Sequence, residues 1–170
     1  MDSFEIKGGT PLYGEVEISG AKNAVLPILA ATLLTREPCV IRRVPDLEDV
    51  RTMCLILESL GATTKIEADV VTVQAAKVGE FADYDLVRKM RASICVLGPL
   101  LARMKKATVS MPGGCLIGTR PVDLHRKAMM SLGAKVTIKG GYITARARKL
   151  VGGEMFLGGR SGPTVLGTAN

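Results

Sequence analysis

A single cysteine of this chain, Cys115, lies in a glycine-rich segment with an arginine, Arg120, five residues further on. The two glycines before the cysteine permit sharp turns and a close backbone approach to a ligand. A thiol in such a segment is accessible to a substrate, and the planar guanidinium of an arginine suits phosphate or carboxylate groups. These residue types point to a site for an anionic small molecule. The alternative is an ordinary Pro-Gly-Gly turn beside a small apolar cysteine.

Two further cations precede apolar segments that we expect to be helices. Lys22 lies just before the apolar residues 24–34, and Arg91 lies just before the apolar residues 94–102. Both segments are apolar all round, which predicts central, buried helices. The free N–H groups and the dipole at a helix N-terminus favour an anion, and a cation adds to that attraction. Alternatively, each long side chain simply extends from a helix end to water.

These segments recur because the chain repeats itself at a constant offset. Residues 60–66 resemble residues 132–138, and at the same offset residues 26–30 resemble residues 98–102. The pattern of each unit predicts a buried helix, a strand, an amphipathic helix and two short strands. We expect a third unit to begin at Ser161 and to stop inside its first helix. A repeat cut there leaves an unfinished core, which suggests that the chain is one part of a larger protein.

The amphipathic helix of each unit has a predicted start and stop. The acidic residues Asp46, Glu48 and Asp49 open the first helix, where they suit the helix dipole, and Gly61 supplies a left-handed stop. In the second unit, Pro121 and Gly133 occupy similar places. Residues 70–73 and 142–145 are predicted to be short strands. The apolar face of the first helix contains Leu47, Val50, Cys54, Leu57 and Leu60.

Composition limits the class of protein. The chain has 170 residues, of which 47% are hydrophobic, so we expect one folded domain with a real core. The N-terminus lacks the apolar region of a signal peptide, and the longest apolar run is too short to span a bilayer. We therefore expect a cytoplasmic protein with no membrane partner.

The net charge of +7 raises nucleic acid as a partner. The basic residues are concentrated in three groups, 42–43, 103–106 and 146–149, and they lack the aromatic interleaving of single-strand binders. We therefore expect no nucleic acid partner and interpret the charge as solvated surface charge. A basic nucleic-acid module on a similar repeat fold remains as an alternative that rests on charge alone.

The cysteines and the histidine do not form a metal framework. Cys39, Cys54, Cys95 and Cys115 match no zinc spacing, and His125 is the single histidine. In the absence of a secretory signal we expect reduced thiols. We therefore predict no metal site, and acid–base chemistry has to come from cysteine, lysine, carboxylates or His125 itself.

Three segments resemble a known family, the UDP-N-acetylglucosamine enolpyruvyl transferases (UDP-N-acetylglucosamine 1-carboxyvinyltransferases). They are Ser-Gly-Ala-Lys-Asn-Ala at 19–24, Met-Arg-Ala-Ser-Ile at 90–94 and Pro-Gly-Gly-Cys-x-Ile-Gly-x-Arg-Pro-Val-Asp-Leu-His at 112–125. The resemblance covers essentially the whole chain. It implies an α/β (α+β) fold, an inside-out barrel of repeated βαβαββ units with helices inside and sheets outside. The sister family of the shikimate pathway shares this fold but lacks the cysteine segment.

The same resemblance implies a division into domains. Residues 1–20 are expected to be strands of a second domain, and residues 21–170 the first domain, with two units and the start of a third. The C-terminal half of such an enzyme completes the second domain and carries a catalytic aspartate and further arginines. We therefore expect the isolated chain to be incomplete and inactive alone. The alternative is a truncated, non-catalytic domain that binds the UDP-sugar.

The family reaction transfers the enolpyruvyl group of phosphoenolpyruvate to the 3′-hydroxyl of UDP-N-acetylglucosamine and releases phosphate. It is the first committed step of peptidoglycan synthesis and the target of fosfomycin. The resemblance implies that both substrates and the C-terminal half are the partners, and that neither a cofactor nor a metal takes part.

The resemblance also implies the site residues. Cys115 would be the proton donor and the site of covalent adducts, with Lys22 as the second catalytic residue. Asp123 has an alternative role as a helix cap. The expected substrate-binding residues are Lys22, Asn23, Arg91, Arg120, Pro121, Val122, Asp123, Leu124, Ser161 and Gly162.

Overall fold

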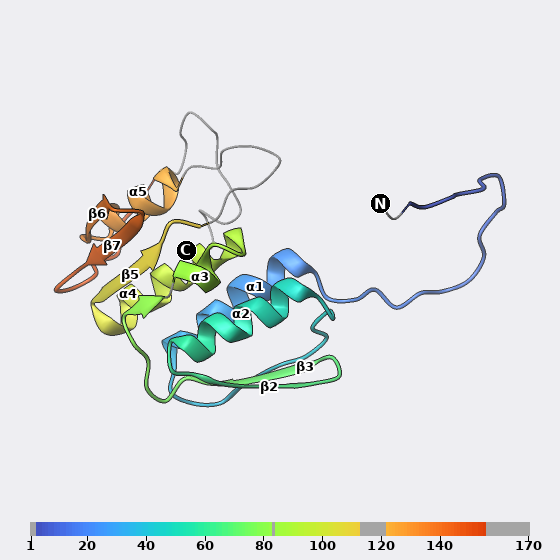
Figure 1. Ribbon diagram of the computed structural model, residues 1–170, viewed down its shortest axis with the longest axis horizontal. Helices are drawn as coiled ribbons and strands as arrows, with labels where there is room; N and C mark the ends of the chain where they lie inside the picture. The colour runs from blue at the N-terminus through green and yellow to red at the C-terminus, as the bar shows by residue number, and fades with distance from the viewer. Residues whose placement is uncertain (1–2, 83, 113–121, 156–170) are drawn as a thin grey trace.

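A computed structural model of the chain describes residues 3–82, 84–112 and 122–155. The described helices and strands fall into two consecutive units (Figure 1). The first contains α1 (Lys22–Ala31), η1 (Thr32–Leu34), β1 (Cys39–Ile41), α2 (Glu48–Ser59), β2 (Thr63–Glu67) and β3 (Val70–Gln74). The second contains β4 (Phe81–Ala82), α3 (Tyr84–Val87), η2 (Arg91–Val96), α4 (Leu97–Met104), β5 (Lys106–Ser110), α5 (Asp123–Ser131), β6 (Lys135–Lys139) and β7 (Tyr142–Arg146).

Each unit contributes one sheet, and the register of the strands confirms the repeat. The first sheet has the order β1-β3-β2 and is antiparallel, while the second has the order β4-β5-β7-β6 with β4 and β5 parallel. Ile66 pairs with Val71 in the first sheet, and at the equivalent position of the second sheet Ile138 pairs with Ile143. The predicted short strands at residues 70–73 and 142–145 are therefore confirmed.

Helices α1, α2 and α4 lie between the two sheets, as expected for an inside-out arrangement, whereas α5 lies beside β6 (Figure 1). Helix α1 contacts α2 of its own unit and η2 of the next, and α4 contacts η1. Buried and more exposed side chains alternate along β3 and β7, so each sheet turns one face toward the core. Large, fully buried side chains of this core are Leu29, Leu33, Met53, Ile56, Leu57, Ile94, Leu97, Leu100 and Leu101.

The amphipathic helix of each unit begins and ends as the sequence predicts. Helix α2 buries Val50, Cys54 and Leu57 on its predicted apolar face. The chain then turns through Gly61 (φ +99°) after α2 and Gly133 (φ +91°) after α5. L-residues with a Cβ rarely adopt these left-handed angles, so glycine is the residue that ends both helices.

The expectation that the first apolar segment is a helix buried all round is wrong in part. The α-helix ends at Ala31, and the chain continues as the short η1. Ile28 is 49% exposed, so α1 has a side that the described parts of α2 and η2, which it contacts, leave uncovered. The second apolar segment likewise starts as the 3₁₀ helix η2 and becomes α-helical only at Leu97.

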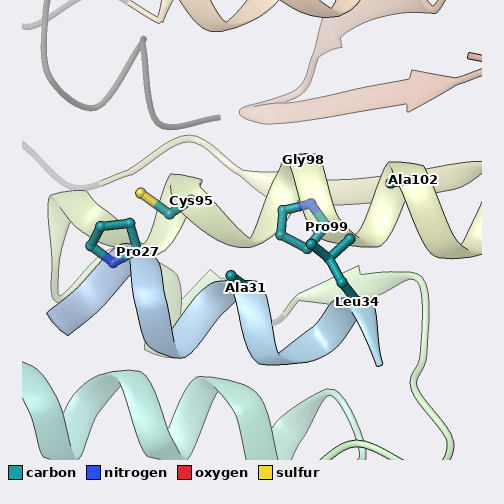
Figure 2. Close-up of a pocket in the computed structure, with 7 residues that line it drawn as sticks. All are labelled: Pro27, Ala31, Leu34, Cys95, Gly98, Pro99 and Ala102. Atoms are coloured by element: carbon teal, nitrogen blue, oxygen red, sulfur yellow. The ribbon is translucent and has the colours of Figure 1, made fainter. Parts of the chain in front are cut away.

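An apolar groove of about 210 Å³ lies between these two helical segments (Figure 2). None of its described lining residues carries a charge, so the part of the groove that the structure describes offers no partner to an anionic ligand. Its lining residues are Pro27, Ala31, Leu34, Cys95, Gly98, Pro99 and Ala102.

Residues 3–20 extend away from the body of the structure and form neither helix nor strand (Figure 1). The end of this segment is held by Arg43, whose guanidinium donates a hydrogen bond to the carbonyl of Ile18 at 2.9 Å. A Cβ on Gly20 would lie 2.0 Å from the carbonyl oxygen of Arg43, so only glycine permits this close approach. The assignment of residues 1–20 to a second domain stays a prediction. The strongly exposed apolar residues of this segment are Phe4, Ile6, Leu12, Tyr13, Val16 and Ile18.

One basic residue that the sequence analysis interprets as solvated surface charge connects the two units instead. The guanidinium of Arg103, at the end of α4, donates hydrogen bonds to the carbonyls of Leu33 at 2.8 Å and Thr35 at 2.9 Å. It also donates to the carbonyl of Ala76 at 3.1 Å. Sequence position alone does not distinguish this arginine from its exposed neighbours, because its acceptors lie in the preceding unit.

Replacing Arg103 by methionine should therefore destabilise the fold. We expect Arg103→Met to lower the free energy of unfolding by about 2 kcal/mol, since hydrogen bonds to a charged group are lost and carbonyls are left without a donor. The matched control is Arg148→Met at an exposed arginine, for which we expect a change within about 0.5 kcal/mol. Urea denaturation of the protein measures both values, and equal losses would contradict the role of Arg103.

Candidate functional site

The first predicted site residues, Lys22 and Asn23, are the first two residues of α1 and are exposed. No side chain of the described residues caps this helix start, which follows Ala21 in an extended conformation. The first N–H groups of a helix have no acceptor within the helix. The start of α1 therefore presents amide donors and an ammonium group to solvent, as the sequence predicts.

A carboxylate of the neighbouring helix contacts this lysine. The Nζ of Lys22 lies 3.0 Å from Oδ2 of Asp49 in the first turn of α2. The side chains are 52% and 36% exposed, so the pair lies at the surface. The sequence indicates Asp49 only as an acid that suits the dipole of its own helix, since nothing in the chain signals its contact with a residue of the preceding helix.

Arg91 is the first residue of η2 and is half-buried. Because η2 contacts α1, the segments that contain Lys22 and Arg91 lie on neighbouring elements. Arg91 also acts electrostatically on His125 in α5. The structure thus brings together three segments that are far apart in the sequence.

The described part of the third predicted segment is the start of α5. Val122 and Leu124 are buried, whereas Asp123 between them is exposed. Asp123 is the first helical residue and Val122 is the cap, without a side-chain hydrogen bond, so the alternative that Asp123 caps the helix is wrong. The carboxylate is still well placed for the helix dipole.

His125 is a residue of this region that the sequence analysis considers only by exclusion. It is only 2% exposed, and neither ring nitrogen has a hydrogen-bond partner in the described part of the chain. Burial, with a smaller contribution from the Arg91 cation, lowers the pKa of His125 to about 4, whereas Asp123 opposes the shift. The imidazole is therefore neutral at pH 7.

The remaining predicted site residues lie outside the described residues, and their roles stay predictions. They are Cys115, Arg120, Pro121, Ser161 and Gly162.

The connection that contains Cys115 is longer than its counterpart in the first repeat. Ile41 in β1 and Val109 in β5 are equivalent, because their partners in β3 and β7, Val71 and Ile143, occupy the same place in the two repeats. Seven positions separate Ile41 from Glu48 at the start of α2, whereas fourteen separate Val109 from Asp123 at the start of α5. The second repeat therefore has extra chain at the place where the sequence predicts the reactive thiol.

The described cysteines differ from a reactive thiol. Cys39, Cys54 and Cys95 are free, as predicted. Burial raises the pKa of Cys95 to about 11 and also raises the pKa of Cys54, so both are protonated at pH 7.

Within the described residues, no group of three histidine, cysteine or acidic side chains is arranged to hold a metal ion. None of the described helices is both long enough and apolar enough to cross a membrane.

The fold is that of an enolpyruvyl-transferase type of domain. The fold matches the crystal structure of the enolpyruvyl transferase NikO from Streptomyces tendae, with a TM-score of 0.70 at 24% identity. The match covers 85% of this chain and 32% of that chain. A family model described as EPSP synthase (3-phosphoshikimate 1-carboxyvinyltransferase) matches residues 6–158. The chain therefore belongs to the EPSP synthase family.

Curated relatives at higher identity are named UDP-N-acetylglucosamine 1-carboxyvinyltransferase. The relative from Methylacidiphilum infernorum is 55% identical over all of this chain, and the one from Helicobacter pylori is 56% identical over 92% of it. The relative from Akkermansia muciniphila is 52% identical over the whole chain. The chain spans about 40% of the length of these relatives.

The buried imidazole makes stability depend on pH. Unfolded His125 titrates near pH 6.5, whereas the folded state resists protonation until about pH 4, so acid favours unfolding between these values. Above about pH 6.5, His125 is neutral in both the folded and the unfolded state, so it no longer lowers the free energy of unfolding. We expect this group to remove about 2 to 3 kcal/mol of the free energy of unfolding between pH 7 and pH 4.5.

Urea denaturation of the parent and of His125→Gln at both pH values measures this contribution. The variant should lose about 2 to 3 kcal/mol less than the parent on acidification, whatever its stability at pH 7. Identical pH dependence in the two proteins would show that His125 is not held neutral by the fold.

Proposed function

We propose that this chain is the N-terminal part of an enzyme that transfers the enolpyruvyl group of phosphoenolpyruvate to the 3′-hydroxyl of UDP-N-acetylglucosamine. The observation that carries the proposal is the similarity over essentially the whole chain to relatives of that name, at 50–56% identity. The segment around Cys115 supports this substrate over shikimate 3-phosphate, because the sister family lacks such a segment. The proposed activity belongs to the longer protein.

The proposed reaction proceeds by addition and elimination. The 3′-hydroxyl of the sugar gives up its proton to a base of the C-terminal half and attacks C2 of phosphoenolpyruvate, while C3 accepts a proton from the Cys115 thiol. The tetrahedral ketal that results then loses a proton from C3 together with inorganic phosphate from C2, which restores the carbon–carbon double bond. A thiol suits this proton transfer because its ordinary pKa lies close to physiological pH.

The cations of the site would bind the anionic groups of phosphoenolpyruvate. Lys22 and Arg120 are assigned to the phosphate and the carboxylate, and Arg91 to either substrate. The geometry supports a role for Lys22, since its ammonium stands half exposed at a helix start with free amide donors. Such preorganised positive charge stabilises the phosphate as it leaves.

The sugar nucleotide would contact Asn23 and the residues from Arg120 to Leu124. Because the side chains of Val122 and Leu124 are buried, they would contribute backbone groups, while the exposed Asp123 carboxylate would contribute its oxygens. Ser161 and Gly162 would contact the diphosphate.

The wider assignment follows from the same family. We propose that residues 1–20 are strands of a second domain, residues 21–170 belong to the first, and a third unit starts at Ser161. A helix of that third unit would cover the apolar groove of Figure 2. The enzyme would act in the cytoplasm in peptidoglycan synthesis, and so in cell-wall formation, cell shape and division, as a target of fosfomycin.

The proposal is tested by removing the thiol in the full-length protein. We expect Cys115→Ser to lower kcat by at least about a hundredfold, the range of general acid catalysis, because serine is a far weaker acid. Cys39→Ser, at a half-buried free thiol, is the control and should keep kcat within about threefold. Phosphate release with both substrates measures the rate. Turnover by Cys115→Ser equal to that of the control would refute the assignment.

A further inference from the structure

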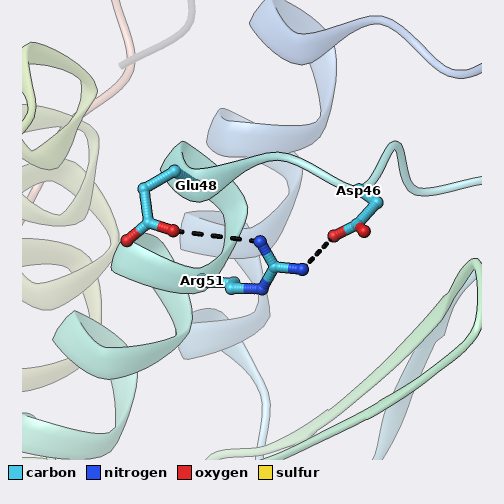
Figure 3. A network of polar contacts seen from close by, with 3 residues as sticks. All are labelled: Asp46, Glu48 and Arg51. Carbon is cyan, nitrogen blue, oxygen red and sulfur yellow. Dashed lines mark hydrogen bonds and ion pairs between the residues drawn. The ribbon is translucent and has the colours of Figure 1, made fainter.

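The acidic residues at the start of α2 divide into two sets with different partners. Asp46 and Glu48 both face Arg51, whose guanidinium forms an ion pair with Asp46 and lies 3.8 Å from Glu48 (Figure 3). Asp49 instead contacts Lys22 at 3.0 Å. Asp46 and Glu48 are 79% and 83% exposed, whereas Asp49 is only 36% exposed. Asp49 is thus the acid of this group that faces the neighbouring helix.

Asp49 offsets an unfavourable concentration of positive charge at the start of helix α1. The N-terminus of a helix carries the positive end of the dipole, and Lys22 adds a full positive charge there. The first turn of α1 contains no acidic residue of its own. The carboxylate that contacts Lys22 is supplied by α2, which packs against α1. Asp49 itself lies in the first turn of α2, where its negative charge is favoured by the dipole of that helix.

The contact fixes part of the lysine and leaves the rest available. An ammonium group has three hydrogen-bond donors, and the contact with Asp49 occupies one of them. The lysine side chain is 52% exposed, so its remaining donors are accessible to a ligand. A lysine is otherwise a flexible point charge on a four-carbon stem, and orienting it costs side-chain entropy.

We propose that Asp49 is a positioning residue that holds the Lys22 ammonium in place to bind the anionic groups of phosphoenolpyruvate. The inference rests on the proposed function, and it adds to the site a residue for which the sequence predicts only a favourable position in the dipole of its own helix. Asp49 acts through Lys22 and does not itself contact the substrate.

The kinetic test compares Asp49→Asn with Glu48→Gln in the full-length enzyme. Asp49→Asn should lower kcat/KM for phosphoenolpyruvate by about tenfold, because the Lys22 ammonium would no longer be held in the position that binds the substrate. KM for UDP-N-acetylglucosamine and the thermal midpoint should stay close to the parent values. Asp49→Glu should restore part of the loss, since it returns a carboxylate. Glu48→Gln removes a carboxylate one position earlier and should behave as the parent.

Protection of Lys22 from reductive methylation gives a readout that does not need turnover. Peptide mapping measures the methylation rate of Lys22 at increasing phosphoenolpyruvate concentration with saturating UDP-N-acetylglucosamine. The concentration that gives half protection should rise about tenfold in Asp49→Asn and remain unchanged in Glu48→Gln.

The outcomes separate this inference from the proposed function. Protection of Lys22 with the same half-protection concentration in parent and Asp49→Asn would overturn the role of Asp49 alone. A loss of kcat/KM shared equally by Asp49→Asn and Glu48→Gln would overturn it too, since a general charge effect would explain both. If phosphoenolpyruvate does not protect Lys22 even in the parent protein, that result would overturn both the assigned substrate site and the role of Asp49.

Discussion

The packing of α1 between two units is the contact on which the described structure depends. This short apolar helix contacts α2 of its own unit and η2 of the following unit, and it buries Val25, Leu26 and Leu29. Arg103 reinforces the junction, because it satisfies the carbonyls of Leu33 and Thr35, which follow α1 in the chain. A repeat unit alone would leave the apolar side chains of its helix exposed, so neighbouring units have to share this helical layer.

The same packing determines where charge is placed. The buried helical segments begin with Lys22 and Arg91, so the contact between α1 and η2 brings together elements that start with cations. Their surroundings differ, because Lys22 is half exposed beside Asp49 whereas Arg91 acts on the buried imidazole of His125. A site for a highly anionic substrate needs positive charge that is held in place before the substrate arrives, and under the proposed function these helix starts would supply it.

Local features of the structure are predictable from the sequence. The left-handed stops at Gly61 and Gly133 and the apolar face of α2 depend on neighbouring residues, and the structure confirms them. The structure also confirms the internal repeat, which is visible as similar segments at a constant offset. The predictions that are wrong concern which neighbouring elements cover a helix or contact a side chain. The sequence shows that α1 is apolar all round, but it does not show which sides are covered.

The residues that sequence analysis misses or misjudges act across long separations. The sequence places Arg103 in a basic cluster and so indicates surface charge. This prediction is wrong because the carbonyl acceptors of Arg103 lie in the preceding unit, far away in the chain. Asp49 and His125 carry no sequence signal of their contacts for the same reason, since Lys22 and Arg91 are distant from them in the chain. Lys22 and Arg91 are identifiable only because each opens a helix whose apolar pattern is local.

The central claim is that Cys115 belongs to a substrate site that UDP-N-acetylglucosamine completes. The most direct measurement exposes the full-length protein to fosfomycin, an epoxide that under the proposed function alkylates Cys115, with and without the sugar nucleotide. Intact mass and peptide mapping then locate the label. We predict that, among the cysteines of this chain, labelling is confined to Cys115 and accelerated by UDP-N-acetylglucosamine. Absence of label, or equal labelling of Cys115, Cys39, Cys54 and Cys95, would contradict the account.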